Sequence, residues 1–140
     1  PAPSSIIRNE DFQKIDFFTP NETEASFYIN QKISSKKDIE FAAEKLINKG
    51  VKNVIITLGS KGAFFKNLNE SFFIEAFNLK DKVLDTTGAG DAFNGALSYA
   101  LSKNLKFREA LVFSNKVAGI STTKFGAANS MPTINEVDKY

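Results

Sequence analysis

A helical pattern that leads directly into a buried strand constrains the fold of this sequence more than any other feature. Apolar residues recur at helical spacing over residues 36–49: Ile39, Ala42, Ala43, Leu46 and Ile47. Ser34 or Ser35 can cap the start of this helix, and Gly50 can end it. Residues 54–58 then form a continuous apolar run rich in β-branched residues, typical of a strand covered on both faces. The pattern therefore predicts an α/β fold.

The remaining patterns predict further strands and helices in one compact α/β layer structure over residues 1–140. Asn21 and Thr133 are each followed three residues later by a glutamate, a spacing that predicts the start of a helix. In chain order, the predicted segments are an irregular start at 1–10, a strand at 15–19, a helix after Asn21, an antiparallel edge hairpin at 63–66 and 72–77, a short strand ending near Leu84, helices at 92–101 and 107–122, and a last helix after Thr133.

Composition excludes several kinds of chemistry. The sequence has no cysteine and no histidine, so thiolate or imidazole metal sites, cysteine nucleophiles and Ser-His triads are excluded, and any metal must be held by oxygen. No apolar run approaches the roughly 20 residues needed to cross a membrane, and we expect a soluble, cytoplasmic protein. With a net charge of +2 and scattered lysines, the chain lacks the basic patch typical of nucleic-acid binding.

The segment from Asp85 to Ala96 carries the clearest signal for chemistry. Its Gly88-Ala89-Gly90 turn precedes a predicted helix, an arrangement whose backbone N–H groups bind anions. Asp91 would repel a bound phosphate unless a substrate hydroxyl lay between them, which favours phosphoryl transfer with Asp91 as base and Gly88 to Gly90 as the anion hole. The alternative is that Asp91 only caps the helix. A Walker A motif is absent, and Phe93 stands where a dinucleotide fingerprint requires glycine or alanine.

Four segments, in order and spacing, resemble motifs of the ribokinase-like (phosphofructokinase-B) sugar kinases. They are Pro20-Asn21-Glu22-Thr23-Glu24-Ala25, Ile56-Thr57-Leu58-Gly59-Ser60-Lys61-Gly62, residues 85–96 and Phe125-Gly126-Ala127-Ala128; Pro1-Ala2-Pro3 is similar to the stretch that precedes them. The resemblance spans almost the whole chain. It implies the carboxyl-terminal part of a three-layer fold, with a mainly parallel sheet, flanking helices and an edge hairpin.

The same resemblance implies ATP-dependent phosphorylation of a sugar hydroxyl, with ribose converted to ribose 5-phosphate as the first candidate reaction. Asn21 would reach the nucleotide phosphates, and Glu24 would help to position Mg²⁺ through water; the alternative is that the pair only caps a helix. Residues 57–62 would border the ATP, or form a plain turn between strands: Thr57, Leu58, Gly59, Ser60, Lys61 and Gly62. Asn115 would lie beside the adenine, or on a solvated helix face.

The resemblance also implies a K⁺ site next to the anion hole. The matching positions offer carboxylate, hydroxyl and main-chain oxygens, which suit a hard cation: Asp85, Thr87, Ser121, Lys124, Gly126 and Ser130. Lys124 would contribute its carbonyl rather than its ammonium group. The alternative is that Asp85 only ends a strand and Ser130 only lies in a loop.

Because the chain starts at Pro1 and its only methionine is Met131, we expect a fragment or a processed piece. The resemblance implies that it is the carboxyl-terminal, nucleotide-binding and catalytic portion of a longer kinase. In this family, the sugar-recognising residues other than the catalytic aspartate, and the lid over the sugar, lie mainly in the amino-terminal half. We therefore expect negligible activity from the isolated chain. The specific sugar and homodimerisation of the intact enzyme stay open. So do the alternatives: a kinase for another sugar or a nucleoside, a non-catalytic nucleotide-binding module, and a structural fragment.

Overall fold

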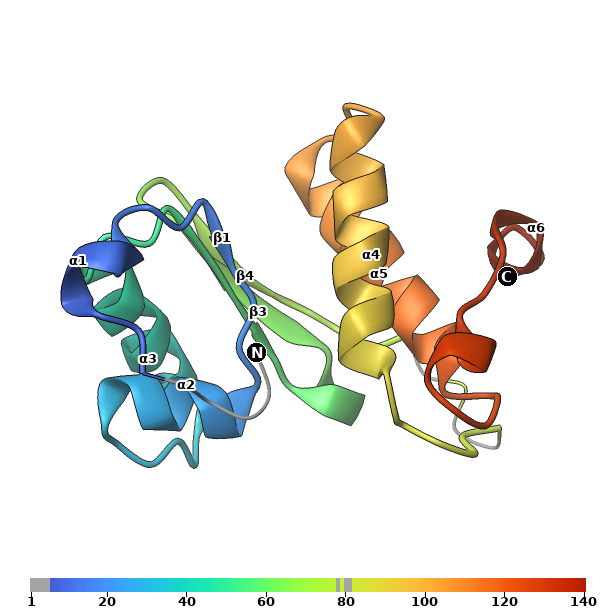
Figure 1. Ribbon diagram of the computed structural model, residues 1–140, viewed down its shortest axis with the longest axis horizontal. Helices are drawn as coiled ribbons and strands as arrows, with labels where there is room; N and C mark the ends of the chain where they lie inside the picture. The colour runs from blue at the N-terminus through green and yellow to red at the C-terminus, as the bar shows by residue number, and fades with distance from the viewer. Residues whose placement is uncertain (1–5, 78, 80–81) are drawn as a thin grey trace. The chain divides into compact units, whose positions relative to one another are not determined.

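The computed structural model describes residues 6–77, 79 and 82–140 (Figure 1). The chain divides into two compact units, Pro1–Ile74 and Glu75–Tyr140. The first unit contains a sheet with its covering helices, and the second is helical among its described residues.

The sheet of the first unit has four strands in the order β1-β2-β3-β4. Strand β1 (Phe17–Phe18) pairs in parallel with β2 (Asn53–Thr57), whereas β3 (Ala63–Lys66) and β4 (Ser71–Ile74) extend the sheet as an antiparallel hairpin. The predicted α/β class and edge hairpin are confirmed. Within this chain the sheet is mixed, with one parallel and two antiparallel pairs.

The described residues of the first unit form three α-helices: α1 (Asn9–Phe12), α2 (Glu22–Ile29) and α3 (Lys36–Asn48). Helices α2 and α3 begin at capping boxes built on Asn21 and Ser35, which confirms both predicted starts. Residues 1–10 were expected to be irregular, and the structure corrects this at α1. The Phe12 side chain is only 1% exposed and packs edge-on against Phe18 and Tyr28, so tertiary burial stabilises a helical turn without helical periodicity.

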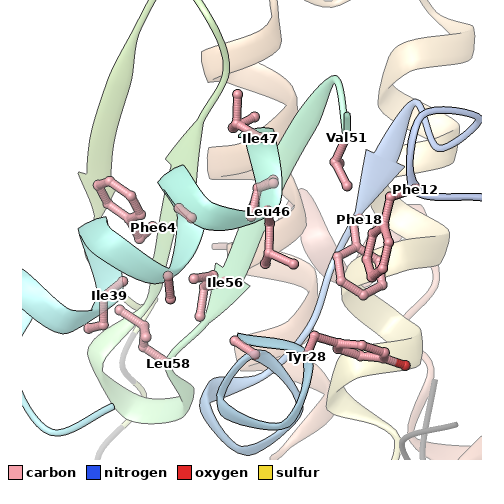
Figure 2. Close-up of a cluster of buried hydrophobic side chains, with 14 residues drawn as sticks. Phe12, Phe18, Tyr28, Ile39, Leu46, Ile47, Val51, Ile56, Leu58 and Phe64 are labelled. Atoms are coloured by element: carbon pink, nitrogen blue, oxygen red, sulfur yellow. The ribbon is translucent and has the colours of Figure 1, made fainter. Parts of the chain in front are cut away.

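The core of the first unit lies between the sheet and helices α2 and α3. Figure 2 shows Ile39, Leu46 and Ile47 of α3 beside Ile56 and Phe64 of the sheet, with Phe12, Phe18 and Tyr28 grouped at one end. Val54 and Ile56 contribute to this cluster, while Ile55, which alternates to the opposite face, is also fully buried. Both faces of β2 are therefore covered, as its continuous apolar run predicted.

The second unit is built on two helices, α4 (Ala89–Ser102) and α5 (Phe107–Ser121), followed by a 3₁₀ turn η2 (Ala128–Ser130) and a one-turn helix α6 (Ile134–Val137). Small side chains of α4 and larger ones of α5 and α6 form its core: Ala92, Ala96, Val117, Ile120 and Val137. The capping box between Thr133 and Glu136 is present as predicted.

Several predicted elements differ from the structure, and the strand expected at 15–19 is shortened to Phe17–Phe18. The short strand expected to end near Leu84 is absent from the described residues 82–84. The N–H groups of Leu84 and Asp85 donate instead to the carbonyl of Thr122, so this backbone is satisfied by the end of a helix. Strand β4 ends at Ile74 rather than at 77, and α4 begins at Ala89, three residues early. In the part of the chain that the structure describes, no helix is long and apolar enough to cross a membrane.

Candidate active site

Two predicted nucleotide segments meet in the first unit. Asn21 and Thr57 form a parallel β-bridge, and the N–H of Thr57 donates to the carbonyl of Pro20 at 2.9 Å. The start of α2 therefore lies beside the end of β2, and the side chains at both ends belong to one surface region of this unit.

Asn21 and Glu24 hold each other in a fixed geometry. The Asn21 Oδ1 atom accepts from the N–H of Glu24 at 2.8 Å, and the N–H of Asn21 donates to Glu24 Oε2 at 2.9 Å. The capping interpretation is thus correct, and it is compatible with a binding role. The Asn21 amide NH₂ is a hydrogen-bond donor that the capping box does not use.

Residues 58–62 form a compact turn between β2 and β3. The N–H of Leu58 donates to the carbonyl of Gly62 at 2.8 Å, and the N–H of Gly62 donates to that of Gly59 at 3.0 Å. Ser60 and Lys61 are exposed at its tip, and Lys61 Nζ lies 3.8 Å from a Glu22 carboxylate oxygen. The turn that the sequence predicted is confirmed, and contact with ATP stays a prediction.

The predicted anion hole, Gly88 to Gly90, is here called the anion loop. It coincides with the N-cap and first turn of α4. Gly88 is the N-cap, so Ala89, Gly90 and Asp91 are the first three helical residues, whose N–H groups have no partner within the helix. The N–H of Ala89 donates to the carbonyl of Thr86 at 3.2 Å. The helix start and its dipole favour an anion beside the N–H groups of Gly90 and Asp91.

Position 88 requires glycine for two reasons, its backbone conformation and the close approach of a neighbouring segment. Its φ is +78°, a value that favours glycine, and a Cβ atom there would lie 3.0 Å from Cα of Ala127. The close approach brings the segment around Gly126 and Ala127 against the anion loop. Two of the sequence motifs, 85–96 and 125–128, are therefore neighbours in the fold.

Asp85 connects the same two segments. Its Oδ1 accepts from the N–H of Thr87 and its Oδ2 from the N–H of Gly126, both at 2.9 Å. The hydrogen bond from the Thr87 side chain, followed by that from the Gly126 backbone, lowers the pKa of Asp85. Three of the six residues predicted for the K⁺ site are thus joined, and Asp85 does not end a strand.

The other three predicted K⁺ residues follow closely along the chain. The N–H of Lys124 donates to the Ser121 carbonyl at 3.3 Å, and the Ser130 hydroxyl donates to the carbonyl of Ala127 at 2.7 Å. Ser121 and Ser130 are both buried. Among the described residues, no group of three or more acidic side chains could hold a metal ion, so the predicted site would depend on hydroxyl and main-chain oxygens around Asp85.

The Lys124 ammonium group is engaged with a carboxylate. It forms an ion pair with Glu136, with Nζ 2.5 Å from Oε1. The hydrogen bond from Lys124, together with those from Thr133, lowers the pKa of Glu136 to about 2. The predicted contribution of the Lys124 carbonyl to a cation site stays a prediction. The ion pair could not be predicted from the sequence, because a separation of twelve residues carries no local signal.

A pocket of about 320 Å³ lies beside Asp91 within the second unit. Side chains of α4, α5 and residues 131–137 line it: Asp91, Ala92, Gly95, Ala96, Tyr99, Phe113, Val117, Met131, Pro132, Ile134 and Val137. Asp91 is the only charged residue among these described lining residues. A sugar is recognised through its hydroxyl groups, and this apolar lining offers few partners for them. The described residues beside Asp91 therefore indicate no preference for a particular sugar.

Asn115 is buried rather than solvated, which removes the alternative of an exposed helix face. Its Nδ2 donates to the carbonyl of Glu75 at 2.9 Å. One turn later on α5, Gly119 meets the backbone of Phe77, where a Cβ atom would lie 2.3 Å from the carbonyl oxygen. Both residues seat the segment after β4 on α5. Gly119 was not among the predicted residues, although a glycine in the middle of a helix is itself a signal of close packing.

Comparison with known proteins gives consistent results. A family model described as pfkB family carbohydrate kinase matches residues 9–134. The chain is 40% identical to a ribokinase of Haemophilus influenzae over 140 residues, which is 100% of this chain and 45% of that protein. It is 33% identical to a deoxyribokinase of Salmonella typhi over 141 residues, 99% of this chain and 45% of the relative. The chain thus spans less than half the length of these relatives.

Solved structures agree with the fold. A ribokinase from Thermotoga maritima matches with a TM-score of 0.89 and 41% identity, over 99% of this chain and 46% of that one. An Arabidopsis thaliana ribokinase complexed with ribose and ATP matches with a TM-score of 0.91 and 34% identity, over 97% and 44%. A candidate ribokinase II from E. coli, in complex with ATP and Mg²⁺, matches with a TM-score of 0.78 and 26% identity, over 94% and 40%.

Proposed function

The chain belongs to the pfkB family of carbohydrate kinases, and we propose on that premise that it supplies the base and the anion loop of an ATP-dependent sugar kinase. Ribose is the first candidate substrate, and ribose 5-phosphate the product. The observation that carries the proposal is the position of Asp91 as the third residue of α4, three positions after the glycine N-cap Gly88.

In the proposed reaction, the Asp91 carboxylate accepts the proton of the sugar hydroxyl while that oxygen forms a bond to the γ-phosphorus. The bond from phosphorus to the bridging oxygen of ADP breaks. Negative charge on the transferred group is stabilised by the N–H groups at the start of α4. Asp91 is exposed, so its carboxylate is accessible to a substrate.

The nucleotide would be held by the residues that the family resemblance assigns to it. Asn21 would donate its amide NH₂ to phosphate oxygens, residues 57–62 would border the nucleotide, and Asn115 would lie near the adenine. Glu24 would help to position Mg²⁺ through water, and the ion would supply positive charge against the phosphates. The linked set around Asp85, Thr87 and Gly126, with Ser121, Lys124 and Ser130, would hold K⁺ beside the anion loop.

Support for ribose comes from the relatives. The Arabidopsis neighbour was solved with ribose and ATP, and the Haemophilus relative is a ribokinase. A deoxyribokinase is also similar to this chain, so a kinase for 2-deoxyribose or another family substrate is the second candidate. The apolar lining beside Asp91 does not distinguish them. We place the enzyme in the cytoplasm, where ATP is supplied.

Calorimetric titration with a non-hydrolysable ATP analogue and Mg²⁺, with and without K⁺, tests the proposal on the 140-residue chain. We expect saturable binding that weakens without K⁺ or in Asp85→Ala, and binding that is retained in Asp91→Asn. The absence of binding by a chain shown to be folded by circular dichroism would contradict the assignment of the nucleotide site to these residues.

Phosphoryl transfer separates a kinase from a non-catalytic nucleotide-binding module. We expect negligible turnover of ribose by the isolated chain, because the lid and sugar-recognising residues of the family are expected outside it. In a kinase that also contains the lid and the sugar-recognising residues, Asp91→Asn should lower kcat by about 10²- to 10⁴-fold. Undiminished turnover in that variant would exclude Asp91 as the base.

A further inference from the structure

The segment that joins α5 to α6, residues 122–133, is here called the C-terminal loop. It carries Lys124, Gly126 and Ser130, which are half of the predicted K⁺ residues. It also brings Ala127 against Gly88 and the Gly126 N–H to Asp85. The position of this loop therefore affects the anion loop and the proposed cation oxygens together.

An ion pair closes the C-terminal loop. Lys124 Nζ lies 2.5 Å from Glu136 Oε1, and each side chain is 35% exposed. The second oxygen, Oε2, accepts from the Thr133 N–H at 2.8 Å and from its hydroxyl at 3.1 Å. Glu136 thus contacts residues at both ends of the loop with one carboxylate.

Glu136 is itself held by the core of the second unit. It belongs to α6, which has a single turn and would not be stable in isolation. The next residue, Val137, is 2% exposed and packs in the cluster with Ala92 and Ala96 of α4. The carboxylate is therefore anchored to the same helix whose first turn forms the anion loop.

We propose that Glu136 is a positioning residue that, through Lys124, holds the C-terminal loop against Gly88 and Asp85. The functional importance of this loop rests on the proposed kinase function, whereas its position can be tested without activity. The ion pair between Lys52 and Asp16 offers a contrast. It is nearly as short, at 2.6 Å, but its side chains are 65% and 64% exposed and neither is a predicted site residue.

Amide hydrogen exchange, followed by NMR on the 140-residue chain, tests the position of the loop. Glu136→Gln removes the charge but keeps an acceptor for Thr133, and Lys124→Met removes the ammonium group but keeps the carbonyl. In both variants we expect the Gly126 N–H to exchange about three- to fivefold faster, because local opening becomes easier. Lys124→Arg, which preserves the pair, and the control Lys52→Met should leave it unchanged.

A second measurement connects the loop to K⁺. The concentration of K⁺ that half-saturates its effect on binding of the ATP analogue should rise by about three- to fivefold in Glu136→Gln, with analogue affinity at saturating K⁺ unchanged. Unchanged Gly126 exchange in both variants would overturn the positioning role. If Gly126 exchanges faster in the two variants but the wild-type chain binds no ATP analogue, the positioning role would be supported and the proposed function overturned. The two failures are therefore distinguishable.

Discussion

Replacement of Gly119 by alanine should destabilise the second unit, although alanine is the better helix former. Gly119 lies inside α5, where the exchange would by itself contribute about 1 kcal/mol in favour of folding. A Cβ atom at this position would lie 2.3 Å from the carbonyl oxygen of Phe77, a distance that real side chains do not adopt. The backbone of one of the two segments must therefore move.

The cost of that movement decides the sign. Overpacking a well-packed site costs about 1–3 kcal/mol, and here the obstacle is a backbone atom rather than the end of a flexible side chain. The segment is also held nearby, because Asn115 donates to the carbonyl of Glu75 two residues before Phe77. Because a backbone atom cannot yield as a flexible side chain does, we expect the upper part of that range, about 2–3 kcal/mol. After subtraction of the propensity gain of about 1 kcal/mol, the net loss from the free energy of unfolding is about 1–2 kcal/mol.

Gly95 provides a matched control on α4. It is also a mid-helix glycine, but nothing lies within 4 Å of the Cβ atom that alanine would add. Gly95→Ala should therefore stabilise the protein by about 1 kcal/mol. Urea unfolding followed by far-ultraviolet circular dichroism would measure the free energy of unfolding of both variants. We expect their m-values to equal that of the wild type, so that a shift of the midpoint reports stability. If Gly119→Ala proved as stabilising as Gly95→Ala, the packing of residues 75–77 on α5 would be refuted.

Four further predictions concern stability and can be followed by the same urea unfolding. Gly88→Ala should cost at least about 1–2 kcal/mol, because its φ of +78° is unfavourable for alanine; no loss would contradict the tight turn before α4. Asn21→Ala should cost about 1 kcal/mol through loss of the α2 cap, whereas an unchanged midpoint would show that the cap is dispensable. Tyr28→Phe should stabilise the first unit by about 1 kcal/mol, because the buried hydroxyl has no partner among the described residues; destabilisation would reveal a missed hydrogen bond. The Glu136 pKa of about 2 lies below its ordinary value of 4.5. The contribution of the Glu136 carboxylate to the free energy of unfolding is therefore complete above pH 4.5 and is lost as the pH falls toward 2. Glu136→Gln should flatten that acid limb, and an unaltered pH profile would contradict the prediction.

Local patterns predicted most elements of the fold. The apolar spacing over 36–49 and the β-branched run after it predicted α3 and β2, and the capping residues Asn21 and Thr133 predicted the starts of α2 and α6. These signals depend on interactions within a few residues, which a sequence displays directly. The strand expected near Leu84 failed, because its backbone donors bind the Thr122 carbonyl from a distant part of the chain.

The sequence by itself determined the α/β class, the family and the identity of the candidate residues, since each is encoded in local spacing and in motifs. Tertiary structure alone decided which residues meet: Asp85 with Gly126, Gly88 with Ala127, and Lys124 with Glu136. It also showed that Asn115 is buried and that Gly119 packs on a carbonyl oxygen. These contacts join segments separated by about ten to forty positions, and a sequence pattern cannot specify such pairs because packing of the whole unit selects them.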